Sequence, residues 1–193
     1  MLERIPAAAY QRMVWKNGLG VTEQIAVSPV DATLAGGFSY RISRAHVTAS
    51  GPFSAFAGCD RILTVIDGEG LSLRRRDTTI ALAPFEPCRF SGDEAMSAVL
   101  ERGPITDFNV IFDRARFDAS CERLRFDEHG CAVLGDHPGT EHFFYCLGGG
   151  LVCEGVTVEP GDSARARFEP GLQPNVFAQA PSSHALHVRL WSR

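Results

Sequence analysis

Apolar and polar residues alternate with a period of two along most of this chain. Residues 21–28 place Val21, Ile25 and Val27 on one face, and residues 38–48 alternate in the same way. Because successive side chains of a strand point to opposite faces, this pattern predicts half-buried β-strands. Glycine and proline interrupt it at short intervals, and no long segment carries an apolar stripe at helical spacing. The pattern therefore predicts an all-β protein.

Further strands are predicted wherever β-branched and aromatic residues gather between turn residues. The sequence Asp67-Gly68-Glu69-Gly70 predicts a hairpin turn between the strands at residues 61–66 and 71–75. The remaining strands are predicted at residues 80–83, 88–91, 96–101, 106–112, 121–126, 143–147, 151–158, 164–168 and 184–191. Many short strands joined by such turns are typical of a sandwich or a barrel.

The two halves of the chain resemble each other. The segment IDGEGL at residues 66–71 is similar to LGGGL at residues 147–151, and each is followed by a strand and a proline-containing turn. Self-similarity of this kind predicts a duplicated β-barrel whose halves pack as one body. We expect the first barrel to span residues 1–105 and the second residues 106–193, with an approximate boundary.

Composition narrows the classes of partner. The chain has 193 residues, of which 45% are hydrophobic and 22% charged, so it can bury a core without disulfides. Its net charge of -4 gives no reason to expect nucleic acid or an anionic membrane as partner. The six cysteines form no CxxC pair and are expected to be buried thiols. No signal peptide and no apolar run long enough to cross a bilayer stands in the sequence, which predicts a cytoplasmic protein.

Several short segments between residues 15 and 110, taken in order, closely resemble the HutD/Ves family. They are WKNGLGVTEQI (15–25), FSYRISRA (38–45), GPFS (51–54), GCDR (58–61), PFEP (84–87), FSGD (90–93) and DFNV (107–110). An ordered series is more specific than one short motif. The resemblance covers about residues 10–114. It implies a bicupin fold of RmlC-like cupin architecture, an association with bacterial histidine utilisation, and a role in ligand sensing or in restraint of pathway flux.

The histidine spacing argues against the metal site found in many cupins. None of the six histidines forms an H-x-H pair, and His184 and His187 should lie on opposite faces of a strand. A loop site built from His137, Glu141 and His142 stays open as an alternative. We expect no metal and no cofactor. The sequence also lacks a Gly-x-Ser-x-Gly elbow and a phosphate-binding loop.

Arg61 is the first candidate for a ligand-binding residue. It begins a β-branched strand and shares its face with Leu63 and Val65. A guanidinium among apolar groups needs an anionic partner, since leaving it unpaired is costly. Pattern alone favours a salt bridge to Asp60, Glu69 or Asp107, whereas the family motif at residues 58–61 favours a ligand carboxylate.

Two further pairs of polar residues lie within predicted strands. Glu23 shares a face with apolar residues, so it either forms an internal ion pair with Arg41 or contacts a ligand. Asp107 and Asn109 share a face opposite Phe108, which places them either in solvent or at a barrel mouth. An asparagine offers both a donor and an acceptor, which suits a small amide or formyl group.

These observations and the resemblance lead to the hypothesis of a metal-free bicupin that binds a small carboxylate metabolite in its first barrel, with N-formylglutamate or urocanate as leading ligands. Arg61 would bind the carboxylate, and Glu23, Arg41 and Asp107 would orient the binding groups. The residues left complete the site: Asn109, Asn17 and Ser43 as neutral hydrogen-bonding groups, and Trp15, Phe53 and Phe90 as walls.

Two other classes of function stay open. The first is a metal-independent isomerase or hydrolase with Glu23 or Asp107 as general base. The second is an interaction module that uses an exposed sheet edge to form a homodimer or to bind another protein. A binding or sensing protein is favoured over an enzyme.

Overall fold

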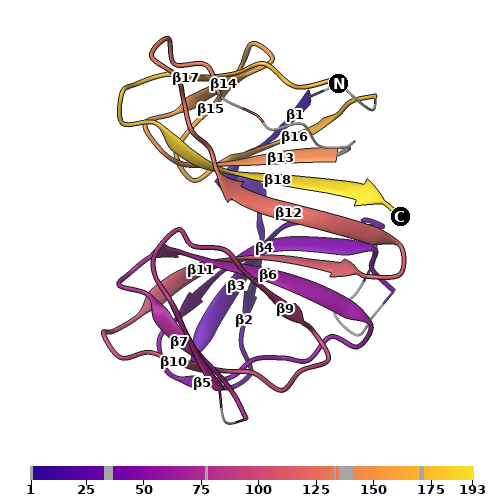
Figure 1. Ribbon diagram of the computed structural model, residues 1–193, viewed down its shortest axis with the longest axis vertical. Helices are drawn as coiled ribbons and strands as arrows, with labels where there is room; N and C mark the ends of the chain where they lie inside the picture. The colour runs from indigo at the N-terminus through magenta and orange to yellow at the C-terminus, as the bar shows by residue number, and fades with distance from the viewer. Residues whose placement is uncertain (1, 33–36, 77, 133, 135–140, 170–171) are drawn as a thin grey trace. The chain divides into compact units, whose positions relative to one another are not determined.

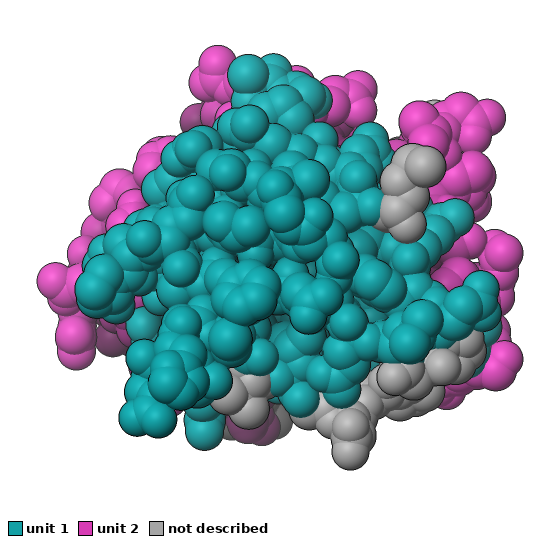
Figure 2. Space-filling model, turned by 90° about the horizontal axis from the view of Figure 1, so that it is seen from above, with its two compact units in different colours: residues 1–10, 118–192 teal, residues 11–117, 193 magenta. Residues whose placement is uncertain are grey.

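The computed structural model describes residues 2–32, 37–76, 78–132, 134, 141–169 and 172–193. In these segments the chain forms 18 strands and one short 3-10 helix, η1 (Ala7–Ala9) (Figure 1). It divides into two compact units, which Figure 2 colours separately. Unit 1 contains residues 1–10 and 118–192, and unit 2 contains residues 11–117 and 193. The all-β prediction is confirmed.

Unit 2 contains a six-stranded and a four-stranded antiparallel sheet. The larger has the order β2 (Gln11–Val14), β3 (Gly20–Ser28), β4 (Tyr40–Val47), β11 (Ile105–Asp113), β6 (Cys59–Asp67) and β9 (Cys88–Ser91). The smaller has the order β5 (Gly51–Pro52), β10 (Ser97–Val99), β7 (Leu71–Arg75) and β8 (Thr78–Leu82). Leu63, Val65, Leu71 and Leu73 belong to one buried cluster that both sheets supply.

Unit 1 is also built from a larger and a smaller sheet. The larger has the order β1 (Leu2–Ile5), β16 (Ser163–Arg167), β13 (Glu141–Gly148), β18 (His184–Ser192) and β12 (Phe117–Arg123). The smaller has the order β15 (Val156–Val158), β14 (Leu151–Cys153) and β17 (Val176–Ala178). Phe144, Cys146, Leu151 and Cys153 belong to the buried cluster of this unit. All six cysteines of the chain are free thiols.

The two units share a strand order. In the larger sheets, β4-β11-β6-β9 of unit 2 matches β12-β18-β13-β16 of unit 1 in sequence order, and β10-β7-β8 matches β17-β14-β15 in the smaller sheets. This correspondence agrees with the similarity between the two halves of the sequence. Among the described residues, however, each unit keeps two separate sheets, so no closed barrel is found. The duplicated barrel stays a prediction.

The unit boundaries differ from those expected. The expected boundary at residue 105 falls at the start of β11, which pairs with both β4 and β6 and so belongs to unit 2. The chain enters unit 1 only after Phe117. Residues 1–10 also belong to unit 1, because β1 pairs with β16.

The hairpin predicted around residues 67–70 is wrong. β7 pairs with β8 and β10 in the smaller sheet, whereas β6 pairs with β11 and β9 in the larger one. Gly68 and Gly70 have φ of +90° and +97°, and a Cβ on Gly70 would lie 2.4 Å from the Leu82 carbonyl oxygen. The glycines therefore turn the chain from one sheet into the other. Within the described part of the chain, none of the helices has the length and apolar character to span a membrane.

Candidate functional site

A cavity of about 620 Å³ opens on one face of the larger sheet in unit 2. A volume of this size is typical of sites for small molecules. Eight of the ten side chains proposed from the sequence line it: Trp15, Asn17, Arg41, Ser43, Phe53, Arg61, Asp107 and Asn109. The structure thus brings together residues from five separate segments of the sequence.

Strand register explains how the polar side chains meet. β11 lies between β4 and β6, so each of its cavity-facing residues has one neighbour on either side. Asp107 lies between Ala45 and Val65, Asn109 between Ser43 and Leu63, and Ile111 between Arg41 and Arg61. The two arginines therefore flank one end of this face, and the carboxyl group lies between apolar neighbours at the other.

The guanidinium of Arg61 is buried without a carboxylate in contact. Only 4% of the residue is exposed. Its Nη2 donates to Asn109 Oδ1 at 2.7 Å and its Nη1 to the Ser54 carbonyl oxygen at 3.3 Å, while its Nε has no hydrogen-bond partner among the described residues. Burial lowers the pKa of Arg61 to about 10, although Asp107 opposes this shift. The side chain is held by neutral acceptors.

Aromatic rings surround the same guanidinium. Its central carbon lies 4.9 Å from the ring centroid of Phe53, 5.2 Å from that of Phe90 and 5.6 Å from that of Phe56. Phe90 is the cross-strand neighbour of Arg61 on β9, so it packs on the arginine without lining the cavity. Cation–π contacts orient a cation but do not neutralise it.

Two of the carboxylates considered as salt-bridge partners of Arg61 pair with other arginines instead. Asp60 pairs with Arg89 at 2.8 Å and Arg114 at 2.9 Å, and Glu69 lies 3.5 Å from Arg102. The hypothesis of a salt bridge from Arg61 to Asp60 or Glu69 is therefore wrong.

Asp107 is fully buried beside this arginine. Its Oδ1 accepts a short hydrogen bond from Asn109 Nδ2, and its Oδ2 has no hydrogen-bond partner in the described structure. Burial raises the pKa of Asp107 to about 7, against the attraction of Arg61 and the bond from Asn109. Desolvation thus outweighs the attraction between the two charges, since both pKa values move toward the neutral form.

Arg41 is the second buried cation of the cavity. It is 5% exposed, its Nε donates to Gln24 Oε1 at 2.8 Å, and burial lowers its pKa to about 10. No carboxylate among the described residues lies within 4.0 Å of it. The ion pair between Arg41 and Glu23, one of the two alternatives left open for Glu23, is therefore not formed.

A β-bulge explains where Glu23 lies. The pairing of β3 with β4 shifts between Gln24 and Ala26, so the alternation of faces changes phase there. Glu23 is opposite Arg44, and its Oε2 lies 2.6 Å from Arg44 Nε, on the face away from the cavity. The placement of Glu23 in the site is thus wrong. Gln24, which the sequence pattern assigned to the other face, contacts Arg41 instead.

The turn between β2 and β3 forms one edge of the cavity. Trp15 is half-buried, and its Nε1 donates to Thr22 Oγ1 at 2.8 Å. Its ring packs against Gly20, where a Cβ would lie 3.0 Å from it. Asn17 is exposed, and its Oδ1 accepts from the backbone N–H of Leu19 at 3.0 Å, so the turn preference of Asn-Gly accounts for its conformation. Asn17 is nevertheless one of the residues that line the cavity.

Comparisons with known proteins place this geometry in a family. The HutD family model matches residues 7–179. The chain belongs to the HutD family. An uncharacterised 21.2 kDa protein encoded in the region 3′ of hutC in Pseudomonas putida is 40% identical over 119 residues, which are 61% of this chain and 62% of that protein's length.

Two solved structures have the same fold. HutD from Pseudomonas fluorescens SBW25 is 28% identical over the whole of both chains, with a TM-score of 0.84. A conserved protein of unknown function from Pseudomonas aeruginosa PAO1 is 31% identical over 98% of both chains, with a TM-score of 0.86. Cupin-like proteins of much lower identity share the fold alone. The HutD resemblance seen in the sequence is confirmed.

The histidines of this HutD-family chain form no recognisable metal site in the described residues, where no three His, Cys, Asp or Glu side chains converge. His137 lies outside the described residues. Glu141 and His142 are adjacent on β13 and therefore point to opposite faces, Glu141 toward Arg165 and His142 toward His187. The absence of a resident metal stays a prediction.

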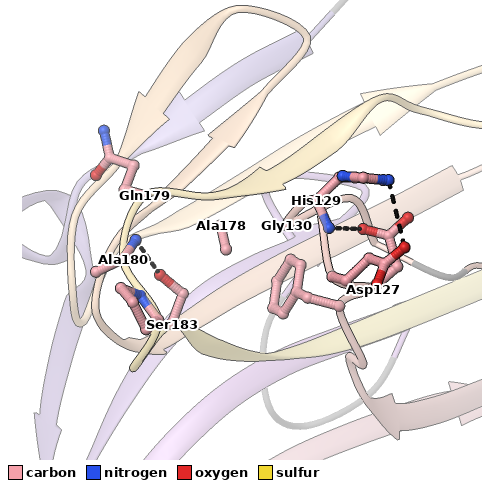
Figure 3. Close-up of a pocket in the computed structure, with 10 residues that line it drawn as sticks. Asp127, His129, Gly130, Ala178, Gln179, Ala180 and Ser183 are labelled. Carbon is pink, nitrogen blue, oxygen red and sulfur yellow. Dashed lines mark hydrogen bonds and ion pairs between the residues drawn. The ribbon is translucent and has the colours of Figure 1, made fainter.

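A second hollow, of about 460 Å³, lies in unit 1 (Figure 3). Its polar groups are engaged in local turns: Asp127 Oδ1 accepts from the backbone N–H groups of His129 and Cys131, and Ser183 Oγ accepts from that of Ala180. None of the residues that line it is a buried charged side chain. The cavity of unit 2 is therefore the better candidate for a ligand site.

Proposed function

We propose that this protein binds a small carboxylate-bearing metabolite in the cavity of unit 2. The observation that carries the proposal is the pair of buried guanidinium groups, Arg41 and Arg61, which contact neutral acceptors and no carboxylate. An unpaired buried charge is costly. A cavity lined by two such guanidinium groups is therefore suited to an anionic ligand that pairs with them.

The charge balance of the cavity favours an anion over a cation. Lys16, Arg41 and Arg61 line it, and Asp107 is the acidic residue among its described lining residues. Since burial raises the pKa of Asp107 to about 7, this carboxyl group carries only part of a negative charge near neutral pH. A carboxylate ligand would offset the excess positive charge.

Individual side chains fit this role. Arg61 is preoriented by Asn109 and by three aromatic rings, so a carboxylate can accept two parallel hydrogen bonds from it at little entropic cost. Ser43 and Asn17 offer neutral hydrogen bonds, and Trp15 and Phe53 offer apolar walls. Asn109 is engaged by Arg61 and Asp107, so it positions the arginine more than it contacts the ligand.

The relatives suggest which metabolite to test. One is encoded beside hutC, and the family is associated by resemblance with histidine utilisation. N-formylglutamate and urocanate are the proposed ligands, because both are carboxylate-bearing intermediates of histidine breakdown. By binding such an intermediate, the protein would act as a sensor of histidine catabolism or as a restraint on it.

The experiment is calorimetric titration with each acid and with its amide. Wild-type protein should bind one of the acids and bind the amide poorly. Arg61→Lys should weaken binding of the acid by at least several-fold despite its positive charge, because lysine presents a point charge instead of a planar pair of donors. Arg61→Ala should weaken it further, by about 2–5 kcal/mol.

The outcomes separate the roles of Arg61. If both variants bind acid and amide as the wild type does, Arg61 is structural and the proposed site is misplaced. If no acid of this class binds wild type, the proposed function is wrong.

An enzyme is the second candidate, and Asp107 is the observation that favours it. A carboxyl group whose pKa is about 7 in a cavity suits a general base, whereas Glu23 lies on the other face of the sheet. Incubation with the same acids, followed by mass spectrometry, tests for turnover. Product that forms with wild type and not with Asp107→Asn would establish catalysis.

A further inference from the structure

Asp107 is isolated from other charges except the cations of the cavity. Its cross-strand neighbours, Ala45 and Val65, are apolar. The charged groups that face the cavity with it are Arg41 on β4, Arg61 on β6 and Lys16 after β2. β3 contributes only neutral groups there, and Cys88 on β9 and the apolar side chains of the smaller sheet are the other groups packed on this region. The ionisation of Asp107 therefore depends on very few charges.

One amide connects Asp107 to Arg61. Asn109 donates from Nδ2 to Asp107 Oδ1 and accepts at Oδ1 from Arg61 Nη2. The carboxyl group and the guanidinium thus respond to each other without a salt bridge between them. A charge bound against Arg61 changes the pKa of Asp107, because the two groups are buried and connected through one amide, and screening by solvent is weak there.

We infer that a carboxylate bound at Arg61 is taken up together with one proton, which Asp107 accepts. The inference rests on the proposed function. Arg61 is the charged group that lowers the pKa of Asp107, and a bound anion neutralises it. The protonated carboxyl then becomes the stable form, and one negative charge enters as another is lost. The balance at Arg61 is one carboxylate group and one proton bound, so the charge at this end of the cavity does not change.

The direction of the pH effect follows from the two states. In the free protein the pKa of Asp107 is about 7, and the bound anion moves this pKa higher. Below about pH 7 the proton is already present, so affinity should be constant there. Above it a proton must be taken up, so affinity should fall by up to about tenfold for each pH unit until the pKa of the complex is reached.

Calorimetry in two buffers tests the inference. N-formylglutamate is the probe, because its carboxyl groups stay ionised at and above neutral pH. At about pH 8, the apparent binding enthalpy in phosphate and in Tris should differ by the proton uptake multiplied by the difference in buffer ionisation enthalpy. We expect an uptake that approaches one proton in the wild type.

Two variants sharpen the test. Asp107→Asn should show no uptake and an affinity independent of pH, while Asp113→Asn, on the same strand outside the cavity, should behave as the wild type. If Asp107→Asn does not fold, the wild-type slope decides alone. Binding without proton uptake would overturn this inference and leave the proposed function intact. If urocanate binds and N-formylglutamate does not, acetate becomes the probe in the same measurement. Binding of acetate without proton uptake would also overturn the inference.

Discussion

The two units use the same face of their larger sheets in opposite ways. In unit 2 this face carries Arg61 beside Leu63 on β6, and an open cavity lies over it. In unit 1 it carries His142 and Phe144 on β13 and His187 on β18. Here the rings are stacked: Phe144 and His187 lie 4.6 Å apart between centroids, and Nδ1 of His142 lies 2.9 Å from Nε2 of His187.

The arginines on these faces differ in the same way. Arg189 of unit 1 is as buried as Arg61, but its Nη2 lies 2.7 Å from Glu122 Oε1 and its Nε donates to Ser120 Oγ at 3.0 Å. Arg61 donates to a carbonyl and an amide oxygen only. The same strand order therefore supports two kinds of face. One is filled and its charges are paired within the fold, whereas the other is open and its arginine has no carboxylate partner. Only the open face suits binding of a ligand.

The largest expected effect concerns stability against pH in unit 2. The folded-state pKa of Asp107, about 7, lies above its unfolded value of about 3.9, so stability is fully present at low pH and is lost as pH rises toward and past 7. Asp107→Asn keeps an acceptor for Asn109 and cannot ionise. Relative to wild type it should gain on the order of 2–4 kcal/mol in free energy of unfolding between about pH 4 and pH 8.

Urea denaturation of both proteins across that pH range measures this gain. Asp113→Asn supplies the control, since it makes the same chemical change on the same strand outside the cavity. A constant difference between wild type and Asp107→Asn at every pH would show that Asp107 is not isolated from compensating charges. The contrast between the open and the filled face would then fail.

The sequence predicted much of this site because its information is local. Alternation alone placed Asp107 and Asn109 on one strand face, and Arg61 and Leu63 on another. The resemblance carried by the ordered motifs then assigned both strands to one candidate site. Sequence alone did not give the register that places Arg41 and Arg61 on either side of Ile111. That register depends on pairing between distant strands, which local pattern does not encode.

Other misses share this physical cause. The extra residue in the bulge of β3 moves Glu23 off the face that alternation assigned to it, and nothing in the local sequence marks it. The glycine-rich turn after β6 has the composition of a hairpin turn but connects two sheets. The pairing of β1 with β16 joins the start of the chain to a strand far along the sequence, and no short-range signal predicts it.

The second prediction exchanges each buried arginine for a side chain of similar shape without charge. Arg61→Met removes a buried cation that lacks a carboxylate partner, so the free energy of unfolding should change by less than about 1 kcal/mol or rise. Arg189→Met leaves Glu122 and Ser120 without their donor and should lower it by about 1–3 kcal/mol.

Chemical denaturation of the two variants at one pH gives the comparison, and titration with the acid shows whether Arg61→Met has lost binding. Equal destabilisation by both substitutions would mean that Arg61 is as fully compensated within the fold as Arg189. The open face of unit 2 would then have no unpaired charge to offer a ligand.

The smallest expected effect comes from two adjacent residues of β3. Glu23 pairs with Arg44 on the outer face, where their side chains are 31% and 21% exposed, so Glu23→Ala should lower stability by only about 0–1 kcal/mol and leave binding unchanged. Gln24 holds Arg41 Nε at 2.8 Å, so Gln24→Ala should weaken binding of the acid by about 0.5–1.5 kcal/mol, a few-fold in affinity. Parallel titrations of the two variants measure the difference in affinity. Because Glu23 and Gln24 are neighbours in sequence, comparing the two variants shows which of these residues lies on the cavity face. Weaker binding from Glu23→Ala than from Gln24→Ala would contradict the bulge and restore the simple alternation of β3.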